Sequence, residues 1–238
     1  MELGDRRTEW FVPAFGPLQF RLFVGLLFLP YTGMVLAYTA IGAMLAPTIH
    51  WDRAGALFIV YFLALGIGAH ALDALGSGGV KPWGKTFSPQ QLKILAGVSI
   101  GVAYVIGGYY MLRDVPLLWP VAALEGFFVL AYNLEWFNGR FHTDTWFAFS
   151  WGCLPVLAGY IMQTNSLSFA ALLIAGSMGL FSFVEIKASR PYKDLKRRVS
   201  TDNAAEQAQL RQLEAILKSV SFAVILLGAG LLTWRWIP

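Results

Sequence analysis

The stretch EGFFVLAYNLEWFNGRFHTDTW, residues 125–146, contains the pattern that decides the fold. It begins in apolar sequence, becomes polar around Asn138-Gly139, and returns to apolar sequence after Asp144. Asn-Gly pairs favour tight turns, so the pattern predicts two apolar helices joined by a short polar hairpin. A carboxyl group, Glu125, lies inside the first apolar segment. Ionisable groups in a membrane segment are costly and usually face a cavity or a partner.

The composition of the whole chain places these helices in a membrane. Hydrophobic residues make up 57% of the sequence and charged residues 13%, whereas a soluble globular domain has about 25% charged residues. Apolar stretches of about 20 residues, long enough to cross a bilayer as a helix, recur along the chain. The sequence therefore predicts an all-α, polytopic transmembrane helical bundle, with residues 1–238 forming one integral-membrane domain.

The apolar stretches predict about seven spans. They lie at 19–45, 54–75, 90–112, 115–133, 144–162, 166–187 and 212–236. Pro30 and Pro155 fall inside the first and fifth spans and predict a kink in each, because proline lacks a backbone N–H. Residues 1–18 contain several aromatic side chains and are predicted to form an interfacial N-terminal segment. Residues 188–211 are predicted to form a basic cytoplasmic loop.

The placement of lysine and arginine predicts the orientation. With seven spans, one face of the membrane holds the N-terminus and the loops after the even-numbered spans. All but three of the 18 basic residues fall on that face, and the exceptions are Arg53, Arg113 and Arg235. Basic residues are enriched on the cytoplasmic side, so the N-terminus is predicted to be cytoplasmic and the protein to lie in the cytoplasmic (inner) membrane. The positive charge thus indicates orientation, and no nucleic-acid partner is predicted.

Two pairs of polar residues lie within the predicted helices. His70 and Asp73 are three positions apart, so they share a helix face. They could hold a divalent cation, act as an acid–base pair, or form an interhelical hydrogen-bond pair. Glu125 and Tyr132 are two helical turns apart and could form a proton relay or a pair that locks two helices together. The partner expected for Glu125 is Tyr132, His70 or Asn133.

The polar hairpin and the basic segment add candidate ligands. Glu135, His142 and Asp144 follow the fourth span, although polar residues are also ordinary in an interfacial loop. The segment KASRPYKDLKRR, residues 187–198, is strongly basic. Such a run either contacts anionic lipid or clamps a phosphate or pyrophosphate, for which arginine offers bidentate geometry. The even-numbered loops are predicted to converge on one cytoplasmic mouth, bringing together His70, Asp73, Tyr132, Asn133, His142 and an arginine of 190–198.

This layout resembles the UbiA superfamily of intramembrane prenyltransferases, in which loops after the second, fourth and sixth helices build one site. An Asn-Asp-x-x-Asp type motif closes the second helix in that family, and HALD, residues 70–73, stands in the corresponding place. Tyr132-Asn133 and Arg140 resemble its Tyr-containing motif after the fourth helix. The sequence WGCLPVLAGY, residues 151–160, resembles its Gly-rich fifth helix.

The resemblance covers about residues 20–190 and departs from the family pattern in two ways. The second Asp-rich motif, expected after the sixth helix, is replaced by Glu185 and by Asp194 in the basic segment. The family usually has nine helices, against seven predicted spans here. The resemblance implies an enzyme that transfers or processes a prenyl or isoprenoid lipid at a cytoplasmic-side cavity, with Mg²⁺ as its cofactor.

The residue patterns and the resemblance together assign roles to individual side chains. The expected catalytic residues are Asp73, His70, Glu125 and Tyr132. The expected substrate-binding residues are Asn133, Arg140, Lys187, Arg190 and Trp136. The expected metal ligands are Asp73, His70, His142 and Asp144.

Two other functions fit the sequence. Mixed imidazole and carboxylate ligands suit Zn²⁺ or Fe, which gives a metal-dependent intramembrane lipid hydrolase or oxidase as one alternative. Its ligands would come from Glu125, Glu135, His70, His142 and Asp144. The other alternative is a non-catalytic lipid-binding subunit of a membrane complex. In each case the expected partners are the bilayer and a lipid or isoprenoid molecule, and an oligomer or membrane complex is compatible with the sequence.

Overall fold

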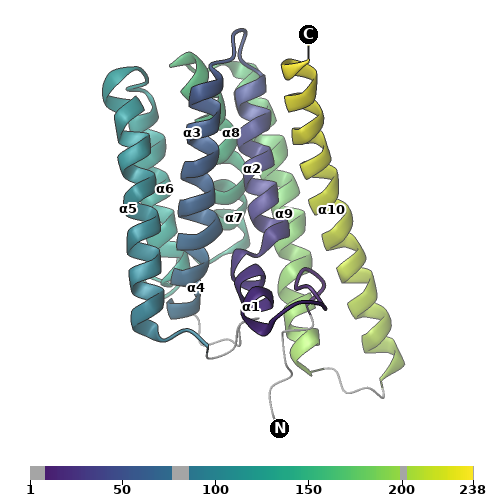
Figure 1. The fold of residues 1–238 in the computed structure, drawn as a ribbon. Helices are drawn as coiled ribbons and strands as arrows, with labels where there is room; N and C mark the ends of the chain where they lie inside the picture. Colours follow the sequence, from purple (N-terminus) through teal and green to yellow (C-terminus); the bar gives the residue numbers. More distant parts are fainter. Residues whose placement is uncertain (1–8, 77–85, 199–202, 238) are drawn as a thin grey trace.

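The computed structural model describes residues 9–76, 86–198 and 203–237, and all regular secondary structure in these ranges is helical (Figure 1). The long helices pack against one another as one bundle (Figure 1). The prediction of an all-α, polytopic helical bundle is therefore confirmed.

The helices follow one another along the chain as a series of long rods, some of them interrupted. In order they are α1 Leu18–Leu27, α2 Leu29–Met44, α3 Trp51–Tyr61, η2 Phe62–Ala69, α4 His70–Gly76, α5 Pro89–Arg113, α6 Leu118–Asn133, α7 Asp144–Phe147, η3 Ala148–Cys153, α8 Leu154–Thr164, α9 Phe169–Arg198 and α10 Ala204–Trp236. The η elements are π-helical. They join their neighbours into two continuous helices, Trp51–Gly76 and Asp144–Thr164.

Five to six candidate membrane spans lie among the described residues. The five helices that are long and apolar enough are Trp51–Gly76, Pro89–Arg113, Asp144–Thr164, Phe169–Arg197 and Ala204–Trp236. The bent pair of α1 and α2 counts as a sixth if it is one span. The predicted fourth span corresponds to α6, whose 16 residues are shorter than the about 20 of a standard span. Helix α1 lies at one end of the bundle and α10 finishes at the other (Figure 1).

Proline explains the interruption of the first predicted span. Pro30 occupies the first turn of α2, and the axes of α1 and α2 differ by 41°. Phe28 between them has a left-handed backbone with φ of 43°. A proline has no N–H to continue the hydrogen-bond ladder of the preceding helix, so the predicted kink at Pro30 is confirmed. Pro155 similarly lies in the first turn of α8, directly after the π-helical η3.

The segment 188–211, predicted as a loop, is helical over 188–198 and 204–211, and residues 199–202 lie outside the described part of the chain. Helix α9 continues through Arg198, and α10 begins at Ala204, where the Asn203 side chain accepts hydrogen bonds from two backbone N–H groups. The C-terminal part of α9 has an apolar face that packs against α10, where Tyr192 and Leu217 belong to one buried cluster. Lysine and arginine also favour helix. The charge of this segment did not interrupt the helix.

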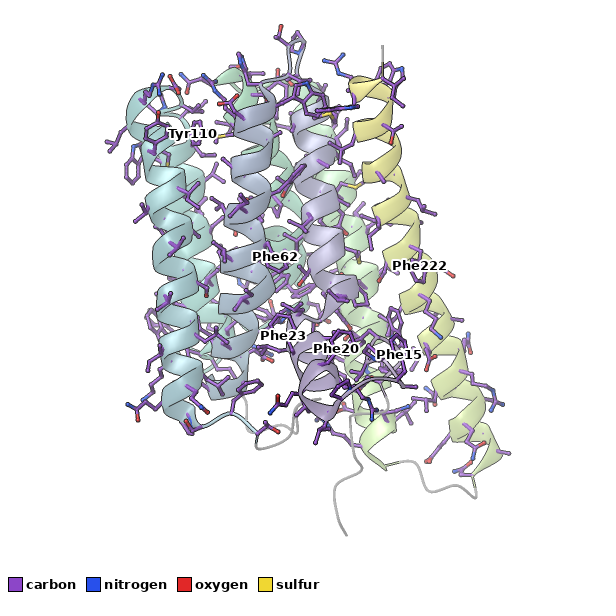
Figure 2. All side chains as sticks on the ribbon, in the orientation of Figure 1. Phe15, Phe20, Phe23, Phe62, Tyr110 and Phe222 are labelled. Atoms are coloured by element: carbon purple, nitrogen blue, oxygen red, sulfur yellow. The ribbon has the colours of Figure 1, made fainter. Side chains whose placement is uncertain are left out.

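Exposed aromatic side chains surround α1. Phe15, Phe20 and Phe23 lie around this helix, near one end of the bundle, as Figure 2 shows, and each is at least 45% exposed. Aromatic side chains of this kind are enriched at membrane–water boundaries. The assignment of residues 1–18 to the interface stays a prediction, and residues 1–8 lie outside the described part of the chain.

Small residues let α2 and α8 touch at the level of the backbone. A Cβ atom added to Gly42 would overlap the backbone carbonyl of Val156, and one added to Gly159 would overlap the carbonyl of Thr39. Close backbone approach through small residues is a common way for membrane helices to pack, because lipid provides no hydrophobic force between them. Helix α2 is therefore held at fixed depth and angle at the centre of the bundle.

The orientation can be tested with two cysteines in a Cys153→Ser background. Gln90 lies in the first turn of α5, and Ser166 lies between α8 and α9. These two positions are at opposite ends of the bundle, and both side chains are exposed. We expect Gln90→Cys to react with a membrane-impermeant maleimide only from the cytoplasmic side and Ser166→Cys only from the outside. Labelling of both from one side, or of each from the reverse side, would contradict the predicted orientation.

Candidate functional site

A cavity of about 300 Å³ lies at the end of the bundle that carries α4 and the C-terminal part of α9. We call it the polar pocket. Its lining residues are Phe28, Tyr31, His70, Asp73, Tyr132, Asn133, His142, Phe147, Trp151, Ile186, Arg190, Lys193, Asp194 and Arg197. They come from four separate parts of the chain, which supply aromatic rings, three basic side chains and two carboxyl groups.

One π-helical segment, η3, contributes to the wall of this pocket, and the other, η2, directly precedes a lining residue. His70 follows η2 directly, and Trp151 lies within η3. The His70 ring stacks on Phe28 at 4.7 Å between centroids and lies 5.6 Å from the Trp151 ring. A π-helical turn shifts the side-chain register by one residue relative to an α-helix, and such turns are frequent at functional sites. The shifts here determine which side chains of the second and fifth predicted spans line the polar pocket.

The polar hairpin after α6 folds back onto the pocket. The rings of Tyr132 and His142 stack at 4.4 Å, and His142 Nδ1 is hydrogen-bonded to the Tyr132 carbonyl oxygen at 2.9 Å. Arg190 Nη2 donates to the His142 carbonyl oxygen at 3.1 Å. The turn itself contains Asn138 and Gly139 at positive φ, as expected for the Asn-Gly pair. Hairpin and α9 are thereby fixed to each other beside the pocket.

Asp144 connects the hairpin to the basic face of α9. Its Oδ2 lies 2.8 Å from Lys187 Nζ, and its Oδ1 lies 3.0 Å from Arg190 Nε. Arg190 lines the polar pocket and Lys187 does not. Asp144 therefore positions the Arg190 guanidinium at the pocket wall.

The basic face of α9 gives the pocket its charge. Arg190, Lys193 and Arg197 all line it, together with Asp194 from the same helix and Asp73 from α4. Lys193 Nζ lies over the rings of Phe28 and Tyr31, at 5.8 and 5.4 Å from their centroids. Arg190 is paired with Asp144, and Arg197 Nη1 lies 3.5 Å from Asp194 Oδ1. Three basic side chains in one pocket nevertheless supply hydrogen-bond donors for an anionic ligand group.

Several predicted site residues do not lie at the polar pocket. Arg140 and Trp136 are exposed on the hairpin, and Glu125 lines a different cavity.

Tyr61 Oη donates a hydrogen bond to Glu125 Oε1 at 2.9 Å. The partners predicted for Glu125 were wrong, because all three line the polar pocket. Of these, Tyr132 lies seven residues along the same helix from Glu125, which corresponds to about 10 Å of axial rise.

The four expected metal ligands do not form one group. Among the residues that the structure describes, no three or more His, Cys, Asp or Glu side chains are placed to hold a metal ion together. Asp73, His70 and His142 line the polar pocket, while Asp144 is paired with two basic side chains. A mixed imidazole–carboxylate centre for Zn²⁺ or Fe therefore has no ligand cluster in the described chain.

Sequence reasoning did not single out several pocket residues. Arg197 was included only as one of the arginines of 190–198, and Lys193 only as part of the basic segment. Both follow Arg190 at helical spacing, so extending the helix through that segment would have identified them. Only the resemblance of residues 151–160 to the prenyltransferases pointed to Trp151 as a site residue. No sequence pattern pointed to Phe28, because its left-handed backbone depends on the break between α1 and α2.

Comparisons of this chain with protein-family models, with curated proteins and with solved structures gave no match. An aromatic-walled pocket with three basic side chains, at the end of an apolar bundle, is suited to a molecule with an anionic head group and a lipid-soluble chain.

Proposed function

We propose that the protein is a membrane enzyme that transfers or processes an isoprenoid lipid and binds its diphosphate group in the polar pocket. The observation that carries the proposal is the row formed by Arg190, Lys193 and Arg197, facing two carboxyl groups and a wall of aromatic rings in one cavity. The resemblance of the sequence layout to intramembrane prenyltransferases points in the same direction.

The basic row suits a diphosphate. The three cations are spaced at i, i+3 and i+7 on α9, so they lie along one helix face and can contact successive phosphate oxygens. Arginine binds phosphate bidentately, and lysine binds it as a point charge. The ion pair with Asp144 and the bond to the His142 carbonyl restrain Arg190 before a ligand arrives. This preorganisation lowers the entropic cost of binding.

The proposal gives the two carboxyl groups of the pocket a role in holding a magnesium ion together with the substrate, which would require Asp194 to exchange its ion pair with Arg197 for the metal. Asp73 and Asp194 are the pocket carboxylates, and Mg²⁺ is usually held by one or two carboxylates together with substrate phosphates. These two residues would hold the ion, which when bound would neutralise charge that develops on a departing diphosphate. Oxygen ligands also favour Mg²⁺ over Zn²⁺.

The aromatic wall suits a developing allylic cation. Phe28, Tyr31, Phe147 and Trp151 line the polar pocket, and the rings of Phe147 and Trp151 stack at 5.4 Å. Ring faces attract cations through their quadrupole, most strongly where water is absent. The same rings already hold one cation, since Lys193 lies over two of them.

Ligand binding by the whole chain in detergent tests the proposal. We expect geranylgeranyl diphosphate with Mg²⁺ to raise the melting temperature saturably, and geranylgeranyl methyl ether, which lacks the diphosphate, to leave it unchanged. Equal stabilisation by the ether would show that the diphosphate is not recognised and would overturn the proposal. Absence of any saturable effect of the diphosphate would do the same.

Asp73→Asn should remove most of the magnesium dependence. The amide keeps the size of the side chain but loses the charge that attracts the ion. We expect the affinity for geranylgeranyl diphosphate to fall about 10- to 100-fold in Mg²⁺, because one charge-assisted contact contributes about 1.5–3 kcal/mol. In EDTA the affinity should not fall, because the substitution removes a negative charge beside the diphosphate. Isothermal titration under both conditions measures the difference. A loss of equal size in EDTA would indicate a structural role for Asp73.

A further inference from the structure

A second cavity, of about 70 Å³, lies between α3, η2, α5 and α6. We call it the apolar cavity. Its walls are apolar, with side chains such as Leu57, Leu65, Ile100, Met111 and Val121, except where Tyr61, Tyr104 and Glu125 reach it. None of its lining residues lines the polar pocket. The two sites are therefore distinct, although both use the second predicted span and α6.

The carboxyl group of Glu125 is only partly satisfied at this cavity. Oε1 accepts a hydrogen bond from Tyr61 Oη at 2.9 Å, and the described residues make no other hydrogen bond to this carboxyl group. The Tyr104 hydroxyl does not donate to the Glu125 carboxyl group, because it donates to the Ala122 carbonyl oxygen at 2.7 Å. A carboxyl group in apolar surroundings is costly unless both oxygens find partners. Oε2 thus has the capacity for one more hydrogen bond.

Packing beside Glu125 leaves room for a ligand. Gly107 is buried and lines the cavity, yet a Cβ atom added to it would meet only Met111 Cε, at 3.8 Å. Protein interiors are normally close-packed. A Glu–Tyr pair that served only to join two helices would not require this space, so the cavity and the carboxyl group together indicate a binding site.

We propose that the apolar cavity binds a lipid-soluble molecule with a single hydroxyl group, such as a lipid alcohol or an alkylphenol, through Glu125. A hydroxyl group can donate to an ionised carboxylate and can also accept from a protonated carboxyl group. It therefore matches Glu125 in either state, while the apolar walls hold the chain or ring. This inference does not rest on the proposed function of the polar pocket.

Matched alkylbenzenes test the hydroxyl requirement on the unmodified protein in detergent. We expect 4-octylphenol to stabilise the protein saturably and to bind at least about tenfold more tightly than 4-octylanisole, in which the hydroxyl hydrogen is replaced by methyl. Thermal melts over a concentration series give both affinities. Equal affinities, or no saturable effect of the phenol, would overturn the proposal.

Three substitutions and one control test whether 4-octylphenol binds in the apolar cavity. Gly107→Leu fills the space and should lower the affinity for 4-octylphenol at least about tenfold. Gly101→Leu is the matched control on the same helix, because a Cβ atom there meets nothing within 4 Å and Gly101 does not line the cavity. Glu125→Leu should lower the affinity as much as Gly107→Leu, whereas Glu125→Gln, which keeps hydrogen-bonding atoms, should lower it less.

Two outcomes of these substitutions count against the proposal. Unchanged phenol binding in folded Gly107→Leu would place the ligand elsewhere, and equal losses in Glu125→Leu and Glu125→Gln would remove the hydrogen-bonding role. If Gly107→Leu does not fold, the ligand pair and the two Glu125 variants still decide the matter. Geranylgeranyl diphosphate binding should persist in Gly107→Leu, so failure at one site is distinguishable from failure at the other.

Discussion

Arg190→Ala should lower the affinity for geranylgeranyl diphosphate about 10- to 100-fold, because a charge-assisted contact to phosphate contributes about 1.5–3 kcal/mol. Arg190 lines the polar pocket, and its guanidinium is held between the Asp144 carboxylate and the His142 carbonyl oxygen. Removing it takes away a positioned cation at the centre of the basic face. Isothermal titration in Mg²⁺ measures the loss.

Lys187→Ala is the matched control for Arg190→Ala. Lys187 pairs with the same carboxylate, Asp144, at 2.8 Å, but it does not line the polar pocket. We expect this variant to bind the diphosphate within about threefold of the unmodified protein, because exposed ion pairs contribute little. Equal losses in both variants would show that the link between hairpin and α9 matters and that Arg190 makes no direct contact with the ligand.

Gly159→Leu should destabilise the bundle more than any change at the surface. A Cβ atom at this position would overlap the Thr39 carbonyl oxygen and approach Ala43 N to 2.8 Å, and neither backbone atom can move without shifting α2. Overpacking of this kind typically costs 1–3 kcal/mol and sometimes more. For a chain of this length we expect the melting temperature to fall by about 2–12 °C.

The control for Gly159→Leu is again Gly101→Leu, which adds the same side chain where nothing lies within 4 Å. We expect its melting temperature to stay within about 2 °C of the unmodified protein, since surface substitutions usually change stability by less than 0.5 kcal/mol. Melts followed by size-exclusion chromatography compare the two variants. A similar loss in both would mean that leucine itself is harmful to the helices and that the α2–α8 contact is not the cause.

Pairs within one helix could be placed from the sequence, whereas contacts between helices could not. His70 and Asp73 share a face because of helical spacing, and the structure has both at the polar pocket. Glu125 and Tyr132 also share a helix, but they line different cavities. The partner of Glu125, Tyr61, lies 64 residues away in the chain. The spacing of two residues in the sequence determines whether their side chains share a helix face, but it does not determine which neighbouring helix that face contacts.

The basic segment shows the same division. The residue types alone indicate that the segment either binds phosphate or marks the orientation. Its helical conformation brings Tyr192 of α9 into a buried cluster with Leu217 of α10. No local sequence pattern reveals this contact between helices. Once α9 continues through the segment, Arg190, Lys193 and Arg197 lie on one face.

By itself the sequence determined that this is a helical membrane protein, where its long apolar helices lie, and where proline breaks the first of them, but not the extension of α9 and α10 through the basic segment. These are local properties, set by apolar run length and backbone chemistry. Only the tertiary structure decided that the polar pocket and the apolar cavity are separate, and which side chains line each. The physical reason is that cavities form where faces of distant helices meet. Those meetings depend on close backbone contacts such as the one at Gly159 and on the register shifts of the π-helical segments.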